Sequence, residues 1–334
     1  MNQIKPVQIF SKYSYSILLM MLLFSWVLIM SLLSPHFLTT SNFSTVLTRM
    51  SEECLVAVGI TMVVLSGGID LSVGAVMAMV PVLIGTFYGG GMPFALALML
   101  ALSAGIIVGL VNAFLIQVTR IQPMIATLAT MTITRSIVYA ITSGTPLNTF
   151  PVSFFAFSKG QLLGVSNPII VMLLFVVAGT WFLKRTNMGR FIYAVGGSES
   201  AAQASGVNVK RVRFLVFFIS ALCASLAGTM LASRLSVANS DAGMNTALDV
   251  LTAVLLGGTS IRGGEGSLPR SVVGVLIMCL VINGFNLLNI SSFWQLVVMG
   301  TLLIIIVGID AKRREGVLRK LASKLQSKKS NQNY

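Results

Sequence analysis

The polar interruptions of a strongly apolar sequence are the residues that could do chemistry. The segment 66–74, S-G-G-I-D-L-S-V-G, breaks an apolar stretch that otherwise covers residues 56–83. The paired glycines Gly67 and Gly68 can end one helix by adopting positive φ, and the Asp70 carboxylate can cap the next helix. Non-helical backbone at membrane depth must be buried in protein or line a watery cavity. The segment is therefore either a tight helix connection near the cytoplasmic face or a hinge beside a solute path.

A second polar set lies within one predicted helix. Thr127, Thr130 and Thr134 recur at helical spacing, and Arg135 follows directly. One side of this helix is therefore polar and should face protein or water. Thr127, Thr130 and Arg135 are candidates for a solute path.

Three further polar residues have two interpretations. Asp249 opens an apolar run, where it could cap a helix at the membrane edge. An ionised carboxylate at the centre of a spanning helix would cost about 2.5–3.5 kcal/mol. Asn283 and Asn286 could join neighbouring helices by hydrogen bonds. The alternative for all three is a place along the solute path.

A short repeat links two distant segments. The pattern Val-Leu-x-Gly-Gly occurs at residues 64–68 and again at residues 254–258. Gly257 and Gly258 are therefore candidate flexing points, like the glycines of the first copy.

Familiar catalytic and metal-binding motifs are missing from the sequence. There is no His-Glu-x-x-His pair, no Gly-x-Ser-x-Gly elbow and no phosphate-binding Gly-x-x-x-x-Gly-Lys-Ser/Thr loop. His36 is the single histidine, and Cys54, Cys223 and Cys279 are isolated within apolar runs. A metal site needs several convergent ligands. The sequence predicts a chain that is not an enzyme and binds no metal or cofactor itself.

The elements that position these residues follow from composition. Of 334 residues, 55% are hydrophobic and 10% are charged, against roughly 25% charged in soluble domains. The net charge of +14 could suggest nucleic acid binding, but the basic residues lie between long apolar runs, as the positive-inside rule predicts for cytoplasmic loops. We expect an all-α polytopic membrane protein with about ten spanning helices, at residues 16–34, 44–66, 71–88, 94–117, 123–143, 167–183, 214–233, 249–262, 271–288 and 293–309.

The charge pattern also predicts the orientation of the chain. An even number of spans, with most Lys and Arg on one side, places both termini in the cytoplasm. The predicted organisation is a cytoplasmic N-terminus at 1–15, a transmembrane domain at 16–310 and a basic cytoplasmic tail at 311–334.

The longest polar connection predicted on the cytoplasmic side is residues 184–213. Ser198 or Gly197 can cap a short helix that runs from Glu199 to about Ser205, with Gly206 as its stop. A short helix of small residues exposes its backbone for docking. The simpler interpretation is a basic loop that happens to be helical.

Taken together, these residues resemble the permease subunits of ribose-type ATP-binding-cassette sugar importers, a group that includes autoinducer-2 permeases. The resemblance covers residues 44–310. Its motifs are S-G-G-I-D-L-S-V-G at 66–74, P-M-I-A-T-L-A-T-M-T-I at 123–133, G-R-F-I-Y-A-V-G-G-S-E-S-A-A-Q-A-S-G-V-N-V at 189–209, A-G-T-M-L-A-S-R-L at 227–235, L-L-G-G-T-S at 255–260, N-G-F-N-L-L at 283–288 and Asp310.

The resemblance implies a function and its partners. Two permease chains, identical or paralogous, would enclose a translocation path in the bacterial inner membrane, two cytoplasmic ATPase domains would hold ATP and Mg²⁺, and a periplasmic binding protein would deliver a sugar. Transport would follow alternating access. The cytoplasmic connection at residues 184–213 would contain the coupling helix that docks on the ATPase. Its coupling residues would be Gly189, Arg190, Gly196, Gly197, Glu199, Ala201, Ala202 and Gly206.

Two other classes remain open from the residues themselves. An ion-coupled secondary transporter would need ion ligands near the membrane midplane. An intramembrane enzyme would need a convergent polar triad or metal set, which the sequence does not show.

Overall fold

The computed structural model describes residues 6–308, with side chains described for residue 17 and from residue 19 onward. The predicted tail at 311–334, Asp310 and residues 1–5 lie outside this part. The described chain is helical apart from one small hairpin. Its helices are α1 (Pro6–Leu33), α2 (Thr40–Leu65), α3 (Val73–Gly89), α4 (Phe94–Val118), α5 (Pro123–Thr142), α6 (Val152–Lys159), α7 (Asn167–Arg185), α8 (Asn187–Gly197), α9 (Glu199–Ala204), α10 (Val209–Leu235), α11 (Thr246–Leu256) and α12 (Leu268–Leu287), followed by a helix over Ser292–Gly308.

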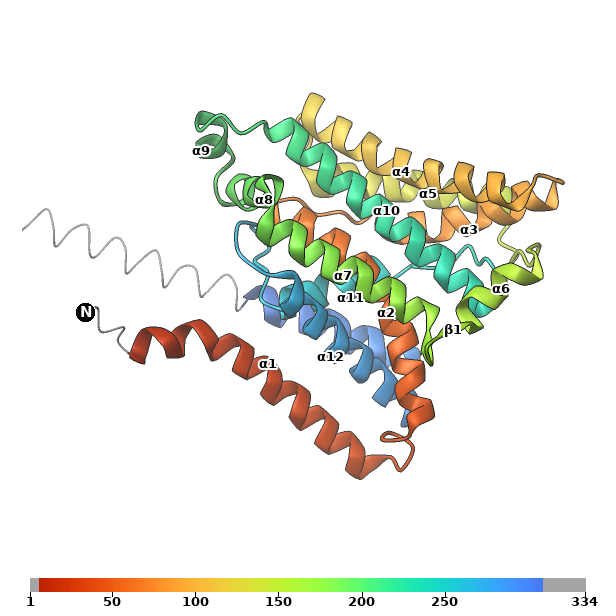
Figure 1. Cartoon of the computed structure of the whole chain (residues 1–334), viewed down its shortest axis with the longest axis horizontal. Coiled ribbons are helices and arrows are strands. Elements are labelled where there is room, and N and C mark those ends of the chain that lie inside the picture. The colour runs from red at the N-terminus through yellow and green to blue at the C-terminus, as the bar shows by residue number, and fades with distance from the viewer. Residues whose placement is uncertain (1–5, 309–334) are drawn as a thin grey trace, which may run out of the picture.

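The helices form a bundle with two distinct ends. Helices α8 and α9 lie at one end, and α6 lies at the other with the antiparallel hairpin of β1 (Gln161–Leu162) and β2 (Val165–Ser166) (Figure 1). Helix α10 begins beside α9 and runs through the bundle, packing against α2, α3 and α4. At 27 residues it is about 40 Å long, so it connects the two ends.

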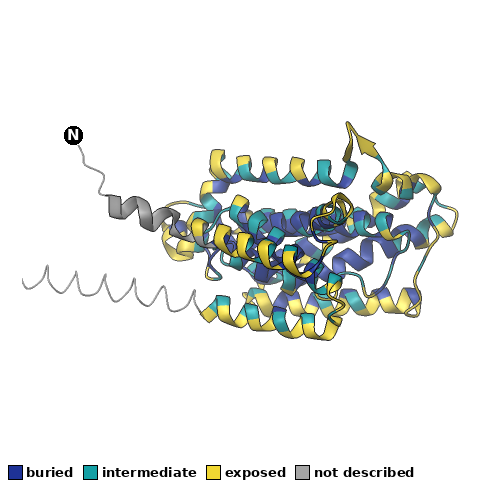
Figure 2. Ribbon diagram, turned by 90° about the horizontal axis from the view of Figure 1, so that it is seen from below, coloured by how far each residue is buried: buried dark blue, intermediate teal, exposed yellow. Residues whose placement is uncertain are grey.

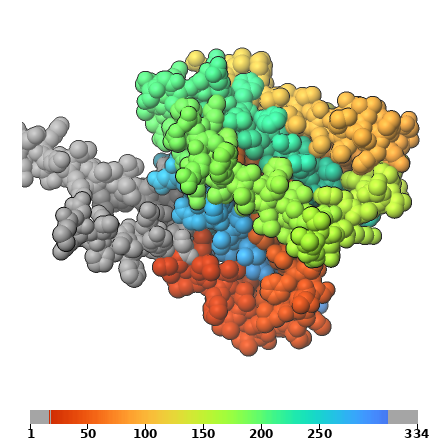
Figure 3. Space-filling model, viewed as in Figure 1, coloured from red at the N-terminus to blue at the C-terminus, as the bar shows by residue number. Residues whose placement is uncertain are grey.

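Burial separates central helices from peripheral ones. The second half of α2 and most of α3 are buried, whereas large apolar side chains of α4 such as Ile107 and Phe114 are exposed. Figure 2 shows the same division, with dark blue central ribbons and yellow outer faces. Exposed apolar faces of this kind are expected where helices meet lipid. Helix α7 covers part of α2 and separates α10 from α12 on the face in Figure 3.

Among the described residues, five helices are long and apolar enough to cross a membrane on their own: α4, α5, α7, α10 and α12. Only part of the predicted span at 249–262 is helical. Helix α11 has 11 residues and ends at Leu256, which gives a length of about 17 Å against a hydrocarbon core of about 30 Å. The cause is Gly257–Gly258, where Gly258 takes φ +83° and the helix ends.

The break between α2 and α3 follows the sequence pattern at its glycine and at its carboxylate. Gly67 has φ +80°, as predicted. Ser72 is the residue before α3 and makes no capping hydrogen bond with its own side chain. The Asp70 carboxylate, only 2% exposed, accepts the Ser72 backbone amide at 3.0 Å, so it does bind a backbone donor at the start of α3.

Candidate functional site

A short exposed helix forms the tip of one end of the bundle. Helix α9 begins after Ser198, whose Oγ accepts a hydrogen bond from the Ala201 amide at 3.3 Å, and Gly206 follows it at φ +82°. This confirms the helix predicted from Glu199 to about Ser205. Ala202 is the one buried residue of α9, and the helix projects beyond the neighbouring helix ends (Figure 1). Most of its surface is therefore free to contact another molecule.

Helix α8 fixes α9 to the bundle. Thr186 caps α8 by accepting a hydrogen bond from the Gly189 amide at 3.0 Å, and a side chain on Gly189 would overlap backbone carbonyls at the end of α7. The exposed Arg190 contacts Asn187 within α8. The Tyr193 hydroxyl donates to the Gly266 carbonyl at 3.2 Å. Burial raises the pKa of the Tyr193 phenol, although the charge of Arg270 opposes the shift.

Four glycines make backbone contacts at the base of α9, and we name Gly67, Gly196, Gly263 and Gly264 the glycine junction. A side chain on Gly196 would overlap the carbonyl oxygen of Leu65, and one on Gly263 would lie 2.8 Å from Cα of Gly67 and 3.0 Å from Cα of Gly196. The Gly264 amide donates to the Leu65 carbonyl at 2.9 Å. The junction therefore joins the end of α2, the end of α8 and the loop between α11 and α12.

Both copies of the repeat lie near this junction in the chain. Gly67 of the first copy belongs to it, and Gly258 of the second copy starts the loop that supplies the other two glycines. Gly257 packs elsewhere, because a side chain there would lie 2.5 Å from the Arg270 carbonyl at the start of α12.

A buried arginine lies between α9 and Gly68, the second glycine of the repeat at residues 64–68. The Arg213 side chain is 7% exposed, and its Nη2 donates to Glu199 at 3.3 Å. Its Nη1 lies 3.1 Å from the position of a Cβ atom on Gly68. Nε and Nη1 have no hydrogen-bond partner among the described residues.

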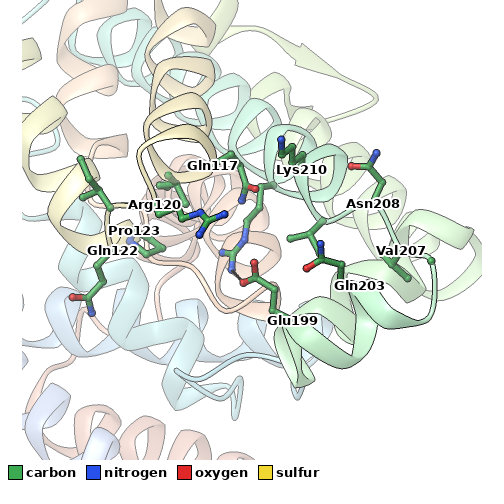
Figure 4. Close-up of a pocket in the computed structure, with 14 residues that line it drawn as sticks. Gln117, Arg120, Gln122, Pro123, Glu199, Gln203, Val207, Asn208 and Lys210 are labelled. Carbon is green, nitrogen blue, oxygen red and sulfur yellow. Dashed lines mark hydrogen bonds and ion pairs between the residues drawn. The ribbon is translucent and has the colours of Figure 1, made fainter.

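A cleft of about 930 Å³, which we name the inner cleft, opens beside α9 between the end of α4 and the starts of α5 and α10 (Figure 4). Its charged members are Arg120, Glu199, Lys210 and Arg213. The full lining is Ile116, Gln117, Arg120, Ile121, Gln122, Pro123, Glu199, Gln203, Gly206, Val207, Asn208, Val209, Lys210 and Arg213.

The Asp70 carboxylate lies at the centre of a buried polar network. Its Oδ1 accepts hydrogen bonds from the Ser72 amide at 3.0 Å and the Ser72 hydroxyl at 2.6 Å, and its Oδ2 accepts from the Ser220 hydroxyl of α10 at 2.8 Å. All three side chains are buried. The network therefore ties the break after α2 to α10.

The threonines of α5 extend this network. Thr130 Oγ1 donates to the Asn112 carbonyl oxygen at 2.6 Å, and the Asn112 amide donates to the Ser72 hydroxyl at 2.8 Å. Thr127 Oγ1 lies within hydrogen-bond distance of the Ile69 carbonyl, at 3.2 Å. The structure thus brings the predicted residues Asp70, Thr127 and Thr130 together, with α4 and α10 as further members.

Arg135 lies apart from that network. Its guanidinium donates to the carbonyls of Ala242 at 2.8 Å and Gly74 at 2.9 Å, and it also contacts the Ser240 carbonyl. One turn later, Tyr139 contacts Asp241. Arg135 therefore holds the loop between α10 and α11 against the start of α3.

A second cleft, of about 340 Å³, lies among α2, α3, α10, α11 and α12, and we name it the outer cleft. It lies near the end of α10 opposite to α9, at Leu231 and Arg234. Its lining residues are Thr45, Val46, Arg49, Glu52, Glu53, Met77, Leu231, Arg234, Thr246, Cys279, Asn283 and Asn286.

Two ion pairs form one wall of the outer cleft. Arg234 donates from Nε and Nη2 to the two carboxylate oxygens of Glu52 at 2.7 and 2.9 Å. Arg49 donates to Glu53 at 2.9 Å. These four residues were not among the sequence-based site candidates, although Arg49 and Glu53 have the i, i+4 spacing of a helical ion pair.

The two predicted asparagines line the same cleft, whereas Asp249 is not among its lining residues. Asn283 exchanges amide hydrogen bonds with Asn42 at 2.7 and 3.0 Å, and Asn286 accepts from Gln295 at 2.9 Å. Asp249 lies in the first turn of α11. The capping interpretation of Asp249 is wrong, because α11 already begins at Thr246.

Metal-ligating side chains stay apart in the described chain: no three His, Cys, Asp or Glu residues between positions 6 and 308 converge on a possible metal site. The three cysteines are buried and unpaired. Several charged side chains described above are held by hydrogen bonds, as for Asp70 and Arg135, or by ion pairs, as for Glu52 and Glu53.

Comparison with known proteins agrees with these observations. The family model described as "Branched-chain amino acid transport system / permease component" matches residues 42–307. The chain is 38% identical to the ribose import permease protein RbsC of Escherichia coli strain K12, over 86% of this chain and 90% of that protein. It is 41% identical to RbsC of Bacillus subtilis strain 168, over 87% and 91% of the two chains. It is 37% identical to the D-allose transport system permease protein AlsC of Escherichia coli strain K12, over 83% and 86%.

No solved structure matches the chain significantly. The family match nevertheless covers every part of the site, from the outer cleft to α9 and the glycine junction. The chain therefore belongs to the family of transport-system permease components, and it is a membrane protein of that family.

Proposed function

We propose that this chain is the permease subunit of an ATP-binding-cassette importer that moves a sugar across the bacterial inner membrane. Its relatives are named for ribose and D-allose. The observation that carries the proposal is the exposed helix α9, which follows α8 at the glycine junction, where α8 contacts the end of α2 and the loop between α11 and α12. A partner that moves α9 and α8 would therefore move the end of α2 and that loop as well.

The proposed orientation places α8 and α9 in the cytoplasm. Basic residues flank them, including Lys184 and Arg185 at the end of α7 and Lys210 and Arg211 at the start of α10. By the positive-inside rule this end of the bundle faces the cytoplasm. About ten membrane crossings would place both chain termini on the same side. The outer cleft would then face the opposite side, where a periplasmic binding protein would deliver its sugar.

The proposed mechanism is alternating access driven by a separate ATPase, which would hold ATP and Mg²⁺. Closure of the ATPase dimer would displace α9 through the exposed residues Glu199 and Ala201. Gly196 and Gly197 would transmit the displacement to the glycine junction, because close backbone packing leaves no side chains to absorb it. A second permease chain, identical or paralogous, would complete the translocation path.

One observation favours an ion-coupled secondary transporter as the second candidate. Glu52 and Glu53 lie within the membrane bundle, where carboxylates often serve ion or proton coupling. Both are already held by arginines in this structure. Such pairing leaves their charge compensated, which supports the importer.

Uptake by reconstituted protein separates the two candidates. The wild-type chain is placed in vesicles with and without its ATPase and the sugar-binding protein, and uptake of labelled D-ribose is measured with ATP or with an ion gradient. We expect uptake only with the ATPase and ATP.

The double variant Glu199→Arg, Gly206→Trp should abolish ATPase docking and uptake, whereas Leu163→Asn, at a 97% exposed position in the hairpin at the other end, should change neither. Gradient-driven uptake by the chain alone would establish the secondary transporter instead.

A further inference from the structure

The charged wall of the outer cleft is unusual for a helix bundle in a membrane. Charged side chains within spanning helices are rare, and they face a bundle interior or a watery cavity when they occur. Here four of them meet in pairs, and Glu52 is 4% exposed. Both arginines are about one-third exposed, with side-chain values of 37% for Arg49 and 32% for Arg234. Their accessible sides border the cleft, so a ligand can reach them.

The pairing leaves hydrogen-bonding groups available without net charge. A guanidinium carries five N–H donors, and Arg234 directs two of its nitrogens, Nε and Nη2, at Glu52. The donors of Nη1 remain for a ligand. The two arginines and the two glutamates of the wall have a summed formal charge of zero. A cation or an anion would therefore find each opposite charge already compensated, whereas a neutral molecule with many hydroxyls would find both donors and acceptors.

The remaining lining supports the same ligand chemistry. Asn283, Asn286 and Thr246 add uncharged polar groups, and Val46, Met77 and Leu231 add apolar surface. A volume of about 340 Å³ lies within the usual range for small-molecule pockets. A sugar presents both hydroxyl edges and an apolar ring face, so it matches this combination of groups.

The cleft is also built from elements that reach the cytoplasmic end. Arg234 lies on α10 about 32 Å from Arg213, which contacts Glu199, the first residue of α9. Thr246 is the first residue of α11, whose other end leads into the loop of the glycine junction. A displacement at α9 therefore has two direct routes to the cleft.

We infer that the outer cleft binds the transported sugar itself, with Arg234 as its main hydrogen-bonding group and Glu52 as the residue that positions Arg234, so that the permease adds its own selectivity to that of the binding protein. This inference rests on the proposed function. The ligand class is a neutral polyhydroxylated molecule of monosaccharide size. Arg49, Glu53 and Asn283 form the surrounding polar surface.

The test uses the complete transporter in vesicles and measures the concentration dependence of uptake. Arg234→Lys keeps the charge and loses the two-pronged geometry, and Glu52→Gln keeps the shape and loses the charge. For both, we expect the half-saturating concentration of sugar-loaded binding protein to stay as in the wild type. The ratio of D-ribose to D-allose uptake, measured with saturating binding protein loaded with each sugar, should change about tenfold, which corresponds to about 1.4 kcal/mol.

Controls separate ligand binding from folding and from coupling. Arg185→Lys, in the last turn of α7, repeats the same substitution outside the cleft and should leave the ratio unchanged. Direct binding of labelled D-ribose to the purified permease in nanodiscs should weaken in Arg234→Lys, while ribose 5-phosphate should compete poorly with the wild type. Because Arg234→Lys could unfold the chain, Asn286→Ala, at an exposed lining position, provides a milder second variant with a smaller shift.

Two results would overturn the inference. One is a folded Arg234→Lys or Glu52→Gln transporter with an unchanged sugar ratio, even if its maximal rate falls, since that pattern reflects a structural role. The other is the absence of D-ribose and D-allose binding to the purified wild-type permease. Neither result affects ATP-dependent uptake by the wild type, so the proposed function would still stand. Loss of ATP-dependent uptake in the wild type would instead contradict the proposed function.

Discussion

Gly196 at the end of α8 lies directly against Leu65 at the end of α2, so that a side chain on Gly196 would overlap the Leu65 carbonyl oxygen. That carbonyl also accepts the amide hydrogen bond of Gly264. Three segments that are far apart in the chain therefore meet at one backbone atom, next to the helix proposed to receive movement from the ATPase. Since no side chain separates them, a shift of α8 must shift the end of α2.

Neighbouring glycines at this place should respond differently to the same substitution. Gly196→Ala should destabilise the chain by about 1–3 kcal/mol, because the methyl group has no room, and should reduce the sugar uptake driven by each ATP hydrolysed. Gly197→Ala should be neutral, since nothing lies within 4 Å of its Cβ position. Thermal unfolding and the ratio of uptake to ATP hydrolysis measure the two effects. Equal behaviour of the two variants would contradict the packing of the junction.

The buried network around Asp70 should be sensitive to loss of its central acceptor. Asp70→Ala leaves the Ser72 amide and hydroxyl and the Ser220 hydroxyl without this partner, and each buried donor left unpaired costs about 1–3 kcal/mol. Ser220→Ala removes one of these bonds together with its donor and should cost clearly less. Denaturation of the two variants in detergent gives the comparison. A smaller loss for Asp70→Ala than for Ser220→Ala would refute the central role of Asp70.

Arg135 should control the order of the loop between α10 and α11. Arg135→Gln removes the donors that hold the carbonyls of Ser240, Ala242 and Gly74. We expect faster hydrogen exchange of the loop amides in this variant, while exchange in α9 stays unchanged. Tyr139→Phe, which removes the contact to Asp241, should give a smaller increase. Exchange measured by mass spectrometry would show whether the loop depends on Arg135.

Tyr193 should make the stability of the α8 end dependent on alkaline pH. Burial raises the pKa of its phenol in the folded chain, whereas the unfolded chain ionises near the ordinary value of about 10. The contribution of the un-ionised Tyr193 phenol to the free energy of unfolding is therefore complete below about pH 10 and falls as the pH rises above it. Tyr193→Phe cannot ionise, and its stability should fall less steeply between about pH 9 and 11. Parallel slopes for the two proteins would exclude this contribution.

Local sequence signals determined the parts of the structure that depend on neighbouring residues. The cap at Ser198 and the glycine at Gly206 define α9, because capping groups lie within a few residues of the backbone groups they satisfy. The positive φ of Gly67 has the same local origin. The apolar runs determined that the chain is helical and enters a membrane, since lipid requires every backbone polar group to be satisfied within the helix.

Only the tertiary structure decided which polar groups meet. Glu52 and Arg234 are 182 residues apart in the chain, and no periodicity in either helix indicates that they form a pair. The sequence places Asp70 at the start of α3, but it does not show that Ser220 of a distant helix donates a hydrogen bond to its buried carboxylate. The glycine junction likewise depends on two helix ends and a loop that meet in space. Charge compensation and backbone contact are set by distance in the folded chain, and a linear sequence specifies such distances only through the complete packing of its helices.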